Sequence, residues 1–151
     1  MVSLLSLPTS ILLLNFIATL FMTGIIWYVQ IVHYPLFSRV GPASFREYEA
    51  LHANLTTAVV LLPMLIELIT ALYLCYERPN GVSALEAFAG AAMLGVIWLS
   101  TMFIQVPKHT LLSAGFDEKV HQALVATNWI RTVLWSLRSV LLTWLMLKVL
   151  R

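Results

Sequence analysis

The chain has 151 residues, of which 60% are hydrophobic and only 11% are charged, and its net charge at pH 7 is +2. Charged residues make up roughly 25% of a typical globular chain, so this composition could not cover a soluble globule with a polar surface. It therefore excludes a soluble enzyme, a disordered tail and a nucleic-acid-binding protein, and it favours an integral membrane protein whose first partner is the lipid bilayer. Cys75 is the only cysteine, which excludes an intramolecular disulfide and a thiolate metal cluster.

The first half of the chain predicts two transmembrane helices, each longer than the about 20 mostly apolar residues that a span needs. The first covers about residues 8–34, since no charged side chain occurs before Arg39. The second covers about residues 44–76, and we expect it to begin at Ser44, because Glu47 follows at the spacing of a capping box.

The second half predicts two more helices. The third covers about residues 84–113, where Ser83 and Glu86 repeat the capping-box spacing and Pro107 is expected to kink the helix without ending it. The fourth covers about residues 118–149, with Asp117 as its N-cap.

The connections between these helices are short, so neighbouring helices should be antiparallel. The predicted fold is a single domain over residues 1–151, an all-α, integral membrane, up-down four-helix bundle. Both chain termini then lie at one end, here end A, and the connections at 35–43 and 114–117 lie at the opposite end, end B. Lys and Arg divide almost evenly between the two ends, which leaves the membrane orientation open.

All four histidines fall in the half of the bundle near end B. Polar side chains inside lipid are costly and usually face the bundle interior, so we expect them to converge. Two Glu-x-x-His pairs, Glu49 with His52 and Glu118 with His121, place a carboxylate and an imidazole on one helix face, as in di-iron and di-manganese bundles. The predicted metal ligands are His33, Glu49, His52, His109, Glu118 and His121.

The expected cofactor follows from the abundance of imidazole. Neutral imidazole suits iron, copper and zinc, one ion or two, and also haem iron. The same groups are suited to proton transfer near neutral pH, which makes His33, His52 and His109 the candidate catalytic residues. The alternative is that these histidines are only solvated at the membrane interface. Four polar residues in the same layer are predicted to contact the cofactor: Gln30, Gln105, Asn128 and Arg131.

Two charged residues fall at a common depth nearer end A. Glu67 and Arg138 are predicted to form a structural ion pair, because an isolated charge at that depth costs a few kcal/mol or more. Arg131 lies closer to end B, where it is suited to an anionic substrate group or a haem propionate, unless it extends to the interface.

Aromatic residues gather near end B as well. They are typical of an interfacial belt, or they form the wall of a pocket for a flat hydrophobic molecule. The group consists of Trp27, Tyr28, Tyr34, Phe37, Phe45 and Tyr48.

Two segments, Val-Pro-Lys-His-Thr-Leu-Leu at 106–112 and Asn-Trp-Ile-Arg-Thr at 128–132, carry a family resemblance. Together with a weaker match at 32–37, they resemble small bacterial membrane proteins of the anthrone-oxygenase-like group. The resemblance implies a four-helix protein, here expected in the bacterial inner membrane, that oxidises a flat phenolic or polycyclic substrate. His109 stands where many members have Asn. Small four-helix haem-binding protoporphyrinogen oxidases are similar at a greater distance.

The leading functional hypothesis is a membrane oxidoreductase or oxygenase-like protein with a His/Glu metal, haem or proton-transfer site near end B. One alternative is a non-catalytic accessory or assembly subunit of a homo-oligomer or larger membrane complex, which would use the small residues at 87–92 for helix contact. Another is a small transporter with Glu67, Arg131 and Arg138 along its path.

Overall fold

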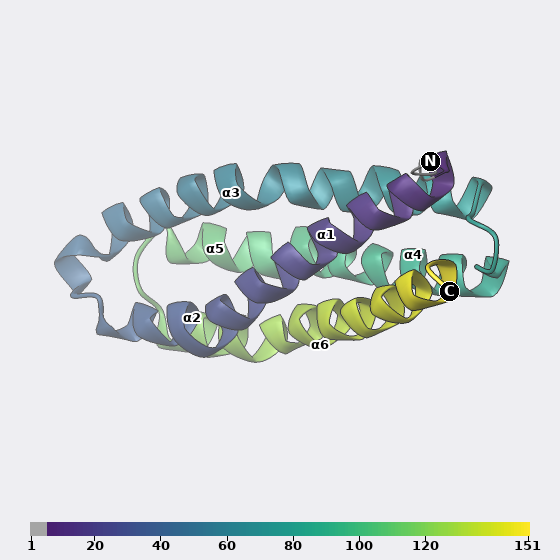
Figure 1. Ribbon diagram of the computed structural model, residues 1–151. Helices are drawn as coiled ribbons and strands as arrows, with labels where there is room; N and C mark the ends of the chain where they lie inside the picture. Colours follow the sequence, from purple (N-terminus) through teal and green to yellow (C-terminus); the bar gives the residue numbers. More distant parts are fainter. Residues whose placement is uncertain (1–5) are drawn as a thin grey trace.

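Four rods of membrane-spanning length form a bundle in the computed structural model, which describes residues 6–151 (Figure 1). The first rod runs through α1 (Leu7–Tyr28), the π-helical η1 (Val29–His33), α2 (Tyr34–Leu36) and the 3-10 segment η2 (Phe37–Arg39). The second rod is α3 (Pro42–Tyr76). The third comprises α4 (Ala84–Ser100), the π-helical η3 (Thr101–Gln105) and α5 (Val106–Leu112), and the fourth is α6 (Glu118–Val149).

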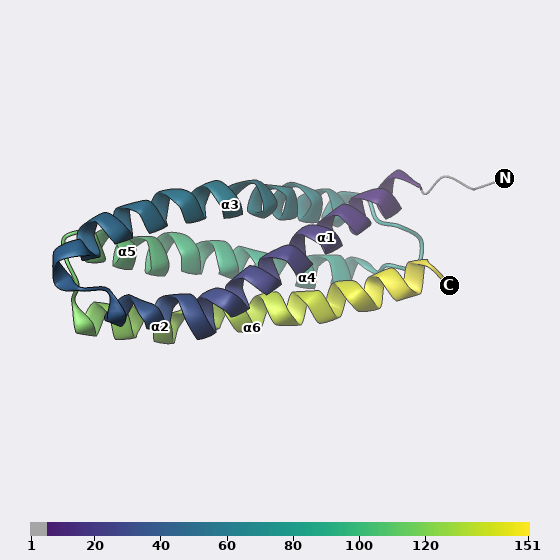
Figure 2. The same ribbon diagram turned by 60° about the vertical axis from the view of Figure 1, so that its left-hand side comes forward.

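The predicted all-α four-helix bundle is confirmed. No strand occurs among residues 6–151, and each rod is long and apolar enough to cross a membrane. Figures 1 and 2 show the start of α1 and the end of α6 at one end of the bundle, as expected for an even number of spans. In both views α1 crosses the bundle obliquely, starting beside α3 near the termini and ending, as α2, beside α6 at the opposite end.

The helix starts agree with local capping chemistry at two of three predicted positions. Ser83 caps α4 through a full capping box with Glu86, and the side chain of Asp117 accepts a hydrogen bond from the backbone of Val120 at the start of α6. The predicted start of the second helix at about residue 44 agrees with α3, which begins at Pro42, but the capping box expected at Ser44 is wrong, because Gly41 is the N-cap. Proline suits the first helical position, because its fixed φ is already helical and its missing N–H is not needed there.

Proline also shapes the two interrupted rods. The third rod continues through Pro107 as predicted, but a π-helical turn, η3, comes directly before the proline-containing segment. The first rod repeats this pattern with η1 before Pro35. A proline ring clashes with the carbonyl four residues earlier, and one wider turn accommodates it; such turns often occur at functional sites. Each wide turn also shifts the helical register of the residues that follow.

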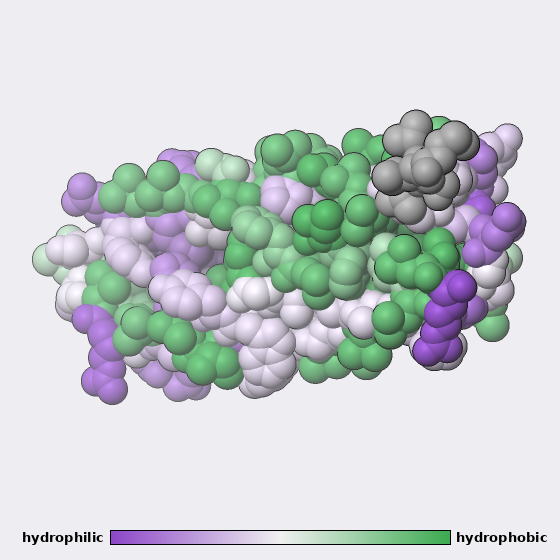
Figure 3. Space-filling model, viewed as in Figure 1, coloured by the Kyte–Doolittle hydropathy of each residue, from purple (hydrophilic) through white to green (hydrophobic). Residues whose placement is uncertain are grey.

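The distribution of polarity is that of a membrane protein. Figure 3 shows hydrophobic residues over the middle of the visible face and hydrophilic ones mainly toward both ends. The large apolar side chains of Leu62 and Phe103 are 65% and 70% exposed, whereas Glu49, Glu67 and Asn128 are fully buried. Apolar groups thus face lipid while polar groups face the interior, which agrees with an integral membrane protein.

Candidate functional site

The predicted polar layer near end B contains a continuous chain of four hydrogen-bonded side chains. The carboxylate of Glu49 lies 2.6 Å from Nδ1 of His109, and Nε2 of His109 lies 2.8 Å from the hydroxyl of Tyr34. That hydroxyl accepts a hydrogen bond of 3.3 Å from Nη2 of Arg131. Because these residues lie on α3, α5, α2 and α6, each of the four rods contributes one member.

The proton positions in this chain follow from its two charged ends. An ionised carboxylate only accepts hydrogen bonds, so Nδ1 of His109 carries the proton and Nε2 is left as an acceptor. Tyr34 then donates its hydroxyl proton to His109, and its oxygen accepts from Arg131. The Tyr34 hydroxyl is therefore polarised from both sides.

Arg131 is a buried cation with no carboxylate partner among residues 6–151. Its guanidinium donates to Asn128 Oδ1, Thr101 Oγ1 and the Tyr34 hydroxyl, all neutral oxygens. No salt bridge to Arg131 occurs within residues 6–151. Asn128 is held in turn by the side chain of Gln30, to which its amide donates a hydrogen bond of 2.9 Å. Two of the predicted polar residues, Gln30 and Asn128, thus position Arg131.

A cavity of about 260 Å³ lies beside these hydrogen-bonded side chains, between α3 on one side and η3 and α5 on the other. Tyr34, His109 and Arg131 line its polar part. The exposed side chains of Thr57 and Thr110 also line it, so the cavity opens on the outer, lipid-facing surface of the bundle. The predicted residues His52 and Gln105 contribute to its wall as well.

The remaining predicted histidines divide into two groups. His33 and His52 are hydrogen-bonded to each other, with 2.7 Å between Nε2 and Nδ1, and the ring of His52 lies 5.1 Å from that of His109. His121 stands apart from this cluster, because its Nε2 donates to the backbone carbonyl of Tyr34. Glu118 is exposed and accepts a hydrogen bond from Gln122, so the structure does not bring this second Glu-x-x-His pair to the first.

This arrangement does not fit a metal ion as it stands. No group of three or more His, Cys, Asp or Glu side chains in the described part of the chain is placed to hold one. Both ring nitrogens of His109 are already used, by Glu49 and Tyr34. A metal or haem at these residues stays a prediction.

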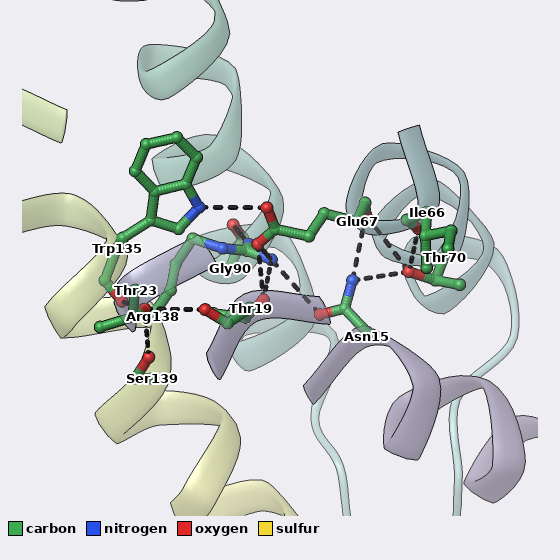
Figure 4. A network of polar contacts seen from close by, with 10 residues as sticks. All are labelled: Asn15, Thr19, Thr23, Ile66, Glu67, Thr70, Gly90, Trp135, Arg138 and Ser139. Carbon is green, nitrogen blue, oxygen red and sulfur yellow. Dashed lines mark hydrogen bonds and ion pairs between the residues drawn. The ribbon is translucent and has the colours of Figure 1, made fainter. Parts of the chain in front are cut away.

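Glu67 and Arg138 belong to a separate network that ties the rods together away from the cavity (Figure 4). Arg138 Nη2 lies 3.4 Å from Glu67 Oε1, and Nη1 donates to the backbone carbonyl of Gly90. The carboxylate of Glu67 also accepts hydrogen bonds from Thr19, at 2.6 Å, and from Trp135, at 3.0 Å. Since all four rods contribute and both charges are buried, the contacts favour the structural ion pair expected from the sequence.

Sequence reasoning missed Tyr34 as a central residue of the site and placed it only among the interfacial aromatics. Its position between His33 and Pro35 was the available sequence signal. A comparison of the chain with models of known protein families, with curated proteins and with solved structures finds no match in any of the three.

Proposed function

We propose that the chain is an integral membrane enzyme of the oxidoreductase or oxygenase type. Its site would remove a proton from a flat, weakly acidic hydrophobic molecule that enters the cavity from the lipid. The observation that carries the proposal is the hydrogen-bonded chain from Glu49 to Arg131 beside a cavity that opens toward lipid. A membrane enzyme of this kind suits the bacterial inner membrane that we expect from the resemblance.

Protons move along the hydrogen-bonded side chains in one direction, from the substrate through Tyr34 to His109. The oxygen of Tyr34 takes the proton from the substrate, while the proton of Tyr34 passes to Nε2 of His109. His109 then becomes an imidazolium, which the carboxylate of Glu49 stabilises at 2.6 Å. A carboxylate that orients and stabilises an imidazole in this way is a recurrent device of general base catalysis.

Arg131 supplies the other half of the chemistry. Removing a proton leaves a phenolate or carbanion on the substrate, and a fixed cation in a water-poor site stabilises such a charge strongly. Since Arg131 lines the cavity and has no carboxylate partner among the described residues, it is available for that anion. The electron-rich anion is the form of the molecule that an oxidant such as dioxygen attacks.

The test uses anthrone, a flat tricyclic ketone with an acidic CH₂ group, as the probe. The purified protein in lipid nanodiscs is incubated with anthrone in D₂O without oxygen, and deuterium uptake is measured by mass spectrometry. We expect uptake above the protein-free rate. We expect it to fall about 100-fold or more in Tyr34→Phe and His109→Gln, because a positioned acid or base contributes that much.

The matched control separates the site cation from charge in general. Arg131→Met should abolish the exchange above background, whereas Arg39→Met, at an exposed arginine near the same end, should leave it unchanged. Equal exchange in wild type, His109→Gln and Arg131→Met would overturn the proposal. So would wild-type exchange no faster than that of empty nanodiscs.

A further inference from the structure

A second cleft opens on the other side of α3. It has a volume of about 310 Å³, and it lies between α3 and the segment formed by α1 and η1. In the ribbon views α1 diverges from α3 as the first rod approaches α6 (Figures 1 and 2). Its walls are largely apolar, with Leu55 and Val59 on α3, and its polar groups come from Tyr28, His33 and Thr56.

His33 connects this cleft to the first cavity. His33 lines the second cleft, His52 lines the first cavity, and their ring nitrogens are 2.7 Å apart. Nδ1 of His33 has no hydrogen-bond partner among the described residues, since the bond to His52 uses Nε2. The ring of Tyr28 is stacked beside His33, with 6.0 Å between ring centroids and 22° between planes.

We infer that this second cleft binds a planar, lipid-soluble molecule with a ring carbonyl, of the quinone type, whose oxygen accepts a hydrogen bond from Nδ1 of His33. Ligand sites are mostly apolar cavities with a few placed polar groups, and this cleft has that composition. A polar N–H in apolar surroundings gains from an acceptor, and the neighbouring ring of Tyr28 offers a flat surface to a planar molecule.

The ligand would also fix the proton on His52, a consequence that rests on the proposed function. A neutral imidazole carries one proton on one of its two nitrogens. When Nδ1 of His33 donates to the ligand, Nε2 of His33 must accept, so Nδ1 of His52 carries the proton and donates to it, and the hydroxyl oxygen of Thr56, 3.1 Å from the same nitrogen, is a second acceptor. Nε2 of His52 is then left as a hydrogen-bond acceptor on the residue that lines the first cavity. Occupancy of one cleft thereby sets the hydrogen-bonding pattern in the other.

The binding test uses 2-methyl-1,4-naphthoquinone as the probe and calorimetry on the protein in nanodiscs. Val59→Trp fills the second cleft, and Leu61→Trp places the same side chain at another exposed position of α3. We expect binding to be lost in Val59→Trp and unchanged in Leu61→Trp. In His33→Phe it should weaken about tenfold, the loss expected for one hydrogen bond. Ala53→Trp, which fills the first cavity, should leave binding intact.

Binding that is equal in Val59→Trp and Leu61→Trp, or that is lost in Ala53→Trp, would overturn the inference, as would the absence of binding to wild type. The coupling has its own readout, because ¹⁵N NMR of labelled histidine distinguishes protonated from unprotonated ring nitrogens. Addition of the quinone should make Nε2 of His52 unprotonated, and no change there refutes the coupling. Quinone binding without anthrone exchange would refute the proposed function and leave the second site standing.

Discussion

The Glu67–Arg138 pair allows a quantitative test of how burial determines the contribution of an ion pair to the free energy of unfolding. Arg138→Met removes the guanidinium from a carboxylate that is fully buried, and it also removes hydrogen bonds to Asn15, Thr19 and the carbonyl of Gly90. Breaking a buried pair by deleting one partner costs about 3–5 kcal/mol, because the remaining charge is uncompensated. Since Thr19 and Trp135 still donate to Glu67, we expect a loss of about 4 kcal/mol in the free energy of unfolding.

A second ion pair in the same molecule is the matched control. Lys148 Nζ lies 2.8 Å from Glu86 Oε1, closer than the 3.4 Å of the buried pair, but these side chains are 28% and 21% exposed. Partly exposed pairs are worth about 0–1 kcal/mol, so Lys148→Met should cost at most about 1 kcal/mol although its contact is shorter.

The assay is equilibrium unfolding in mixed detergent micelles with increasing sodium dodecyl sulfate, followed by circular dichroism. A double variant, Glu67→Gln with Arg138→Met, removes both charges. It should be less destabilised than the sum of the two single variants by about 1–3 kcal/mol, since no buried charge is left alone. If Arg138→Met costs no more than Lys148→Met, or if the two single losses simply add, the reasoning about burial is refuted.

Three further predictions concern local structure and the cofactor. Ser83→Ala should reduce the free energy of unfolding by about 1 kcal/mol, because it removes the cap of α4. Ser44→Ala should have almost no effect, because Gly41 is the N-cap of α3. Unfolding titrations that rank the two variants in the reverse order would contradict this. Glu118→Gln should alter neither stability nor anthrone exchange, since this side chain is exposed and remote from the cavity; a slower exchange rate would return it to the site. Elemental analysis and a visible spectrum of the purified protein should show no stoichiometric metal and no haem band, because both ring nitrogens of His109 are already hydrogen-bonded and no group of three or more His, Cys, Asp or Glu side chains among residues 6–151 is placed to hold an ion; one metal or haem per chain would support the cofactor prediction.

Much of the architecture could be predicted from the sequence, because it depends on local chemistry. A spanning helix satisfies its own backbone hydrogen bonds, so long apolar runs identify it without knowledge of its neighbours. The predicted helices at about 8–34 and 118–149 therefore correspond closely to the first rod and to α6. The cap expected at Ser44 failed because Pro42, two residues earlier, occupies the first helical position of α3.

The residues that form the site were harder to predict, because their contacts depend on which face of its helix each side chain occupies and not only on its depth in the membrane. His109 and His121 were placed in the same layer, yet one contacts a buried carboxylate and the other a backbone carbonyl. The π-helical turns before Pro35 and Pro107 shift the register of the helix, so a regular helical period across them does not give the facing of Tyr34 or His109 reliably.

The sequence by itself determined that this chain belongs in a membrane, that it crosses as four helices, and that its four histidines lie in the half of the bundle near end B. These conclusions follow from transfer energies and helical spacing, which are properties of each segment alone. Only the tertiary structure decided that Tyr34 joins His109 to Arg131, that Glu118 stays outside, and that two clefts flank α3. The physical reason is that hydrogen bonds between rods depend on how the helices cross and rotate, and the oblique path of α1 and its wide turn set both.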